Sequence, residues 1–145
     1  MSTALNTKAR IAVTAAAAAG LVMFLAPAAS AAAAPSSTGT RAQAAACATA
    51  LSSASDDAYN ASWEVHVAGQ DWQGDARAAQ AQLRDPNCAS FAGLIQVRTA
   101  TADSLIAKAV GLAEAGNAAA ADASFESAGE TTQSAWGDIR LIAIG

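Results

Sequence analysis

The only tyrosine and the only histidine of this chain lie in one stretch, YNASWEVHVAGQDW (residues 59–72), together with two of its three tryptophans. On a helix, Tyr59, Trp63, His66 and Gln70 are spaced i, i+4, i+7 and i+11 and therefore share one face. A phenol, an indole and an imidazole on one face could hold a flat apolar ligand, and Tyr and His can both bind haem iron. These four residues are the candidate ligand face. The alternative, which we favour, is that they fill or cover a core.

A single histidine leaves little room for catalysis or metal binding. Zinc sites normally need three or four Cys, His or carboxylate ligands, and Val67 follows His66 where small secreted phospholipases have the Asp of a His-Asp pair. The sequence has no G-x-S-x-G elbow and no glycine-rich phosphate loop. Asp56 and Asp57 are adjacent, so on a helix they point about 100° apart and are expected to be solvated. We therefore expect no enzymatic activity, no metal and no cofactor.

The N-terminus has the pattern of a secretory signal peptide. Lys8 and Arg10 precede the uncharged run IAVTAAAAAGLVMFLA, and small residues follow up to Ala31. This order of basic, apolar and small residues predicts cleavage after Ala31 and secretion. The alternative is an uncleaved signal anchor, because residues 11–34 are uncharged and long enough to span a bilayer. The alanine-rich composition resembles that of exported proteins of GC-rich bacteria.

The net charge restricts the partners of the secreted chain. Without Lys8 and Arg10 it has six basic and twelve acidic residues, a net charge of −6. This acidity argues against binding to nucleic acid or to an anionic membrane. An unidentified protein, another component of the cell envelope or a second copy of the chain stay open as partners, with no membrane contact after signal cleavage.

The two cysteines predict one disulfide. Cys47 and Cys88 are an even pair in a chain expected to be exported, where disulfides form. Such a bond closes a loop of about 40 residues, for which the chain-entropy model gives roughly 4 kcal/mol of stabilisation. The alternative is two buried free thiols.

Composition and periodicity predict an all-α fold. Residues 32–40 are small and polar and are expected to form a flexible leader. Residues 41–145 are rich in alanine and lack sustained alternation of apolar and polar residues, which favours a single domain of about four helices in a small antiparallel bundle. The expected helices start at Thr40, Asp75, Pro86 and Ala118 and end near Ala68, Arg84, Gly116 and the C-terminus.

Local signals define most of these helix ends. Thr40 and Gln43 have the spacing of a capping box, Asp85 precedes a proline that suits a first helical position, and Asn117 can cap the last helix. Two seven-residue repeats in the last helix predict bundle packing; they comprise Ala118, Phe125, Thr132 and Ile139, and Ala121, Ala128, Ala135 and Ile142. The predicted disulfide also requires the first two helices to form an antiparallel hairpin, since an unbroken helix through residues 69–74 would keep the cysteines apart.

Taken without a structure, the sequence predicts a small secreted helical protein stabilised by one disulfide. We expect it to act as a non-enzymatic binding or structural module at or outside the cell envelope. Two alternatives stay open: an extracellular carrier of a small apolar ligand such as haem, and a signal-anchored envelope protein.

Overall fold

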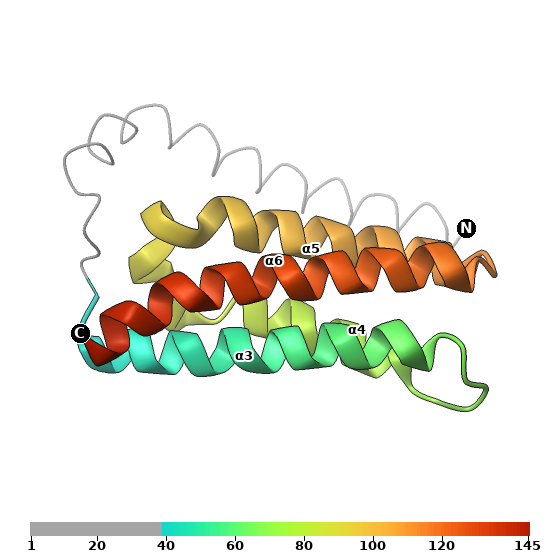
Figure 1. Cartoon of the computed structure of the whole chain (residues 1–145), viewed down its shortest axis with the longest axis horizontal. Coiled ribbons are helices and arrows are strands. Elements are labelled where there is room, and N and C mark those ends of the chain that lie inside the picture. Colours follow the sequence, from blue (N-terminus) through green and yellow to red (C-terminus); the bar gives the residue numbers. More distant parts are fainter. Residues whose placement is uncertain (1–38) are drawn as a thin grey trace, which may run out of the picture. The chain divides into compact units, whose positions relative to one another are not determined.

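The computed structural model describes residues 39–145, which form four α-helices and one short 3₁₀ helix (Figure 1). The elements are α3 (Arg41–Glu64), α4 (Trp72–Leu83), η1 (Pro86–Phe91), α5 (Ala92–Glu114) and α6 (Ala118–Ile144). No strand occurs among these residues, so the expected all-α fold with four helices is confirmed. The signal peptide, its cleavage site and nearly all of the expected leader lie outside the described residues. None of the described helices is both long and apolar enough to cross a membrane.

Three helix starts follow the expected local chemistry. Thr40 forms both halves of the capping box: its hydroxyl accepts from the Gln43 amide at 3.1 Å, and its own amide donates to the Gln43 side chain at 2.8 Å. The Asp85 carboxylate accepts from the Asn87 amide at 2.8 Å, ahead of η1. Asn117 caps α6 through the Ala120 amide at 3.2 Å. Each cap satisfies an amide that has no partner within its helix.

The boundaries differ from expectation around the first turn. α3 ends at Glu64 rather than near Ala68, because the amides of His66 and Val67 bond carbonyls only three residues back and tighten the chain into turns. Gly69 then adopts a positive φ of 86°, which glycine tolerates best. α4 begins three residues earlier than expected, at Trp72, because the Asp71 carboxylate accepts from the Gly74 amide at 2.9 Å.

The third expected helix is divided into two parts. Pro86 starts η1 rather than a continuous α-helix, and the Cys88 amide bonds the Asp85 carbonyl at 3.0 Å in the tighter 3₁₀ pattern. The α-helix proper, α5, begins at Ala92. This short element carries Cys88 to the disulfide.

The predicted disulfide and hairpin are both present. Cys47 on α3 is bonded to Cys88 on η1, with 4.9 Å between the Cα atoms. The helical conformation is interrupted between Glu64 and Trp72, and α4 folds back along α3. α6 packs against both α3 and α5, and its C-terminal end lies beside the start of α3 (Figure 1). The disulfide therefore joins α3 to the segment that leads into α5.

The core is made mainly of alanine. Its few large and fully buried aliphatic and aromatic side chains are Leu51, Phe91, Ile95, Ile106, Phe125 and Ile139. Of the two seven-residue repeats in α6, all members are buried except Ala118 and Ile142, which are half-buried. Because alanine side chains are short, helices packed through them approach one another closely.

Candidate functional site

Tyr59, the first residue of the predicted ligand face, lies in the seam between α3 and α6. Its ring rests on the backbone of Gly129, so closely that a Cβ on Gly129 would lie 2.8 Å from a ring carbon. One turn earlier on α3, the Ser55 hydroxyl donates to the Gly129 carbonyl at 3.2 Å. Burial, and then the nearby carboxylates of Glu130 and Glu126, raise the pKa of the Tyr59 phenol. The ring therefore fills a notch between two helices.

The other three residues of this face do not converge on a cavity. His66 Nε2 lies 2.7 Å from Asp122 Oδ2 on α6, so this ring nitrogen already has a partner. Trp63 is 51% exposed, and Gln70 is exposed in the turn before α4. The structure thus brings Tyr59 and His66 to the α3–α6 seam and leaves Trp63 and Gln70 toward solvent. This arrangement favours the structural interpretation of the stretch.

Trp72 closes one end of the bundle. It is half-buried at the start of α4 and packs against Phe125 of α6, with ring centroids 6.3 Å apart. Edge and tilted contacts of this kind stabilise aromatic pairs beyond the area they bury. Trp72 therefore ties the start of α4 to the core.

A cluster of four carboxylates at the corner between α3 and α4 was not anticipated. It consists of Asp57, Glu64, Asp71 and Asp75, which we call the acidic corner. The Oε2 atom of Glu64 is buried and has no hydrogen-bond partner in the described part of the chain. Burial, a hydrogen-bonding interaction with the Asp75 side chain and the charges of the other three carboxylates raise the pKa of Glu64 to about 7.

Asp57 shares this environment. Burial is the largest cause that raises the pKa of Asp57, followed by the charges of Asp75 and Asp56, while a hydrogen bond from Gln82 acts in the opposite direction. This cluster could have been predicted from the sequence. Asp57 and Glu64 are seven residues apart and share one helical face, and the predicted hairpin brings α4 beside that face. Within residues 39–145 no three Asp, Glu, His or Cys side chains are arranged to hold a metal ion.

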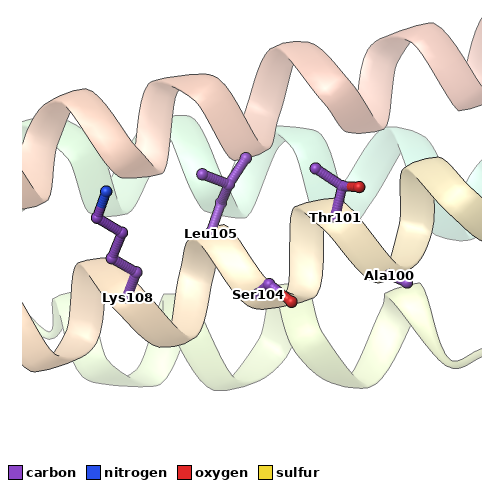
Figure 2. Close-up of a pocket in the computed structure, with 5 residues that line it drawn as sticks. All are labelled: Ala100, Thr101, Ser104, Leu105 and Lys108. Carbon is purple, nitrogen blue, oxygen red and sulfur yellow. The ribbon is translucent and has the colours of Figure 1, made fainter.

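A hollow lies on the outer face of α5. It has a volume of about 370 Å³ and is lined by Ala100, Thr101, Ser104, Leu105 and Lys108. Figure 2 shows Thr101, Leu105 and Lys108 along one edge of this helix and Ala100 and Ser104 along the other. Lys108 is the only titratable side chain in its lining, so the hollow offers no acid–base pair.

Two smaller hollows have different chemistry. One, of about 230 Å³, lies beside the disulfide, with Leu83, Pro86 and Ile95 among its apolar lining. The other, of about 100 Å³, lies between α3 and α6 and includes Asp56 and Trp136 in its lining. None of the four residues of the predicted ligand face lines any of the three hollows.

Large aliphatic side chains are exposed where α5 begins and α6 ends. They are Leu94 (40% exposed), Val97 (80%), Leu141 (59%) and Ile144 (73%), which we call the apolar end. The ion pair between Arg98 and Asp138 joins the two helices at this level. Leu94 lies about one turn before Arg98 and Leu141 about one turn after Asp138, so the antiparallel packing places them at the same level.

Basic residues gather at the same end of the bundle. The first two turns of α3 and α5 and the last two turns of α6 contain Arg41, Arg98 and Arg140 but only one acidic residue, Asp138. The Arg140 guanidinium lies 4.9 Å from the centroid of the Trp136 ring. Arg98 is paired with Asp138, so Arg41 and Arg140 are the basic residues that these turns add to a chain with more acidic than basic residues.

Comparison with protein-family models, with curated proteins and with solved structures finds no match to this chain. The function is therefore argued from the residues themselves.

Proposed function

We propose that this protein is a secreted, disulfide-stabilised helical module that acts by binding a protein partner at or outside the cell envelope. The observation that carries the proposal is the apolar end, where Leu94, Val97, Leu141 and Ile144 are exposed. Several large aliphatic side chains exposed at one end of a small protein are typical of an interaction site. The signal-peptide pattern of residues 1–31 supports export, and the Cys47–Cys88 bond is of the kind that forms in oxidising compartments.

The charges around the apolar end indicate the chemistry of the partner. Arg41, Arg98 and Arg140 lie in the end turns of α3, α5 and α6, as the exposed aliphatic side chains of α5 and α6 do, and Arg98 is paired with Asp138. A partner with an apolar patch and acidic side chains at its rim would complement both properties. The proposal assigns no catalytic role to His66, which is paired with Asp122, or to Ser62, whose hydroxyl donates to the Tyr59 carbonyl at 2.6 Å.

A photo-crosslinking amino acid tests this assignment. It is placed at Val97, or as a matched control at Val67, which is also exposed but lies at the opposite end of the bundle. Crosslinking in the producing cells, followed by sequencing of the joined peptide, should give a discrete product from position 97 whose peptide is apolar with Asp or Glu nearby. Leu141→Asp should abolish that product. Equal products from both positions, or a joined peptide rich in Lys and Arg, would rule out the proposed surface.

One observation favours a second candidate function, the carriage of a small apolar ligand. The hollow beside the disulfide is lined by Leu83, Pro86, Ala92 and Ile95, and its volume is about 230 Å³. Binding pockets usually have about 300–1,000 Å³, so this hollow favours a ligand of a few carbon atoms over haem. NMR titration with hexanol tests the idea: shifts confined to these residues and lost in Ile95→Trp would support it, and unchanged spectra would dismiss it.

A further inference from the structure

We infer that α5 pairs with α5 of a second copy of this chain in antiparallel orientation, so that Val97 of each copy enters the hollow on the outer face of the other copy's α5. The pairing goes beyond the proposed partner binding and does not depend on it. Its surface is the outer face of α5 from Leu94 to Lys108.

The hollow on α5 has the arrangement of a hole in knobs-into-holes packing. Its lining includes Thr101, Ser104, Leu105 and Lys108, at positions i, i+3, i+4 and i+7 of one helix. Four residues with this spacing surround the place where a side chain of a facing helix inserts. Figure 2 shows Leu105 and Lys108 along one side of the hollow and Ser104 along the other. Leu105 is half-buried against the core, and the methylene chain of Lys108 adds a second apolar wall.

Val97 is the side chain that matches this hole. It is 80% exposed, more than any other large aliphatic side chain of residues 39–145. Val97, Thr101, Ser104 and Lys108 are spaced i, i+4, i+7 and i+11, so the valine lies on the same face as the hole. It cannot fill the hole of its own helix, whose centre is about 11 Å further along the axis.

Two-fold symmetry satisfies both contacts at once. If two α5 helices lie antiparallel about an axis near Ala100, each Val97 is opposite the hole of the other copy. A contact made in one direction is then repeated in the other, as in all isologous interfaces. Leu94, which is 40% exposed, comes to lie beside the methylene chain of the partner's Lys108.

The charges of α5 favour a second copy as the occupant. Lys108 and Glu114 are the only charged residues of this helix that are exposed. Arg98 and Asp103 are half-buried, and each is paired, with Asp138 and Arg84 respectively. Net charge makes copies of an acidic chain repel one another, so they can approach most easily through a face that has no unpaired carboxylate. Depletion of charge is also typical of the core of an interface.

The face is small for a dimer interface. From Leu94 to Lys108, α5 is about 21 Å long, and Leu141 of α6 lies beside its start. One helix face of this length is at the low end for a specific interface, so we expect a dissociation constant in the micromolar range. Because the dimer covers Leu94 and Val97, it and the complex with the proposed partner exclude each other.

Analytical ultracentrifugation of residues 32–145, with the disulfide oxidised, tests the pairing between about 1 µM and about 500 µM. The wild type should change from monomer to dimer over this range. Val97→Lys should weaken the dimer at least about tenfold, because it removes the apolar contact and places a second ammonium beside the partner's Lys108. Val67→Lys is the matched control: Val67 is also exposed but lies at the opposite end of the bundle, and this change should leave the dimer intact.

A second substitution tests the antiparallel arrangement. Lys108→Glu, added to the Val97→Lys chain, should restore the dimer to within about threefold of the wild type, because the new ammonium then meets a carboxylate of the other copy. Within one chain, positions 97 and 108 are about 16 Å apart along the axis, so this pair can form only between copies.

Three results would overturn the inference: a wild type that stays monomeric at every concentration, a dimer that tolerates Val97→Lys, or no recovery in the double variant. These measurements use the purified chain alone. Their failure would therefore leave the proposed partner binding untouched, and a foreign peptide joined to position 97 in the producing cells would still identify that partner.

Discussion

Gly129→Ala is expected to destabilise the protein, although it places a better helix former inside α6. Gly129 is buried in the seam with α3, beneath the ring of Tyr59. A Cβ at this position would lie 2.8, 2.9 and 3.0 Å from three atoms of that ring. Ordinary van der Waals contact between carbon atoms needs about 3.5–4.0 Å, so either the ring or the helix must move.

The expected magnitude follows from two opposing contributions. Replacing glycine by alanine in a helix interior stabilises by about 1 kcal/mol. Forcing an extra carbon into a packed seam costs about 1–3 kcal/mol, and any separation of the helices also weakens the hydrogen bond from Ser55 to the Gly129 carbonyl, which contributes about 1 kcal/mol. The sum is a net loss of about 1–2 kcal/mol in the free energy of unfolding.

Gly137→Ala is the matched control, because Gly137 lies in the same helix and a Cβ there would meet nothing within 4 Å. This substitution should stabilise by up to about 1 kcal/mol through helix propensity alone. Urea unfolding of the oxidised proteins measures both variants. Their free energies of unfolding should differ by about 2–3 kcal/mol, with similar dependence on urea concentration.

A double-mutant cycle with Tyr59→Ala decides whether the ring is the cause. Without the ring the clash disappears, so Gly129→Ala should become neutral or stabilising in that background. If Gly129→Ala instead stabilises the wild type as much as Gly137→Ala does, Tyr59 does not rest on Gly129. The reasoning that makes Tyr59 a packing residue would then fail, and its side chain would be available to a ligand.

Three further predictions concern the ends and the charges of the bundle. Reduction of the Cys47–Cys88 bond should lower the free energy of unfolding by about 4 kcal/mol, measured by urea unfolding with and without reductant. Thr40→Ala removes one half of the capping box and should cost about 1 kcal/mol, with faster hydrogen exchange confined to the first turn of α3. The folded state raises the pKa of Glu64 from 4.5 to about 7. The contribution of protonated Glu64 to the free energy of unfolding is therefore complete below pH 4.5 and is lost as the pH rises through 7. With solvent screening, the wild type should lose about 1 kcal/mol relative to Glu64→Gln between pH 5 and pH 8 in urea unfolding.

The features predictable from the sequence are those with local causes. Three helices start where a side chain caps an amide two or three residues ahead, at Thr40, Asp85 and Asn117. A few consecutive residues are therefore enough to predict these starts. The disulfide followed from the even cysteine count together with the expectation of export. It then required the hairpin, because a straight helix would have held Cys47 and Cys88 apart.

The features that escaped prediction depend on contacts between distant segments. The close approach at Gly129 involves Tyr59, seventy residues earlier, and glycine in a helix has no local signature of such a notch. The ion pair of His66 with Asp122 depends in the same way on the register between α3 and α6. The early end of α3 was missed because the competing turn at residues 65–69 is set by three-residue hydrogen bonds that no single residue type predicts.

The alanine-rich core explains why the bulky and the acidic residues gather around residues 59–72. Short side chains let α3 approach α6 closely, so a large ring such as Tyr59 fits only where the facing residue is glycine. At the hairpin, the same short side chains let α4 pack along α3, which brings the carboxylates of the acidic corner together. The stretch that first suggested a ligand site is therefore where α3 meets both α6 and α4.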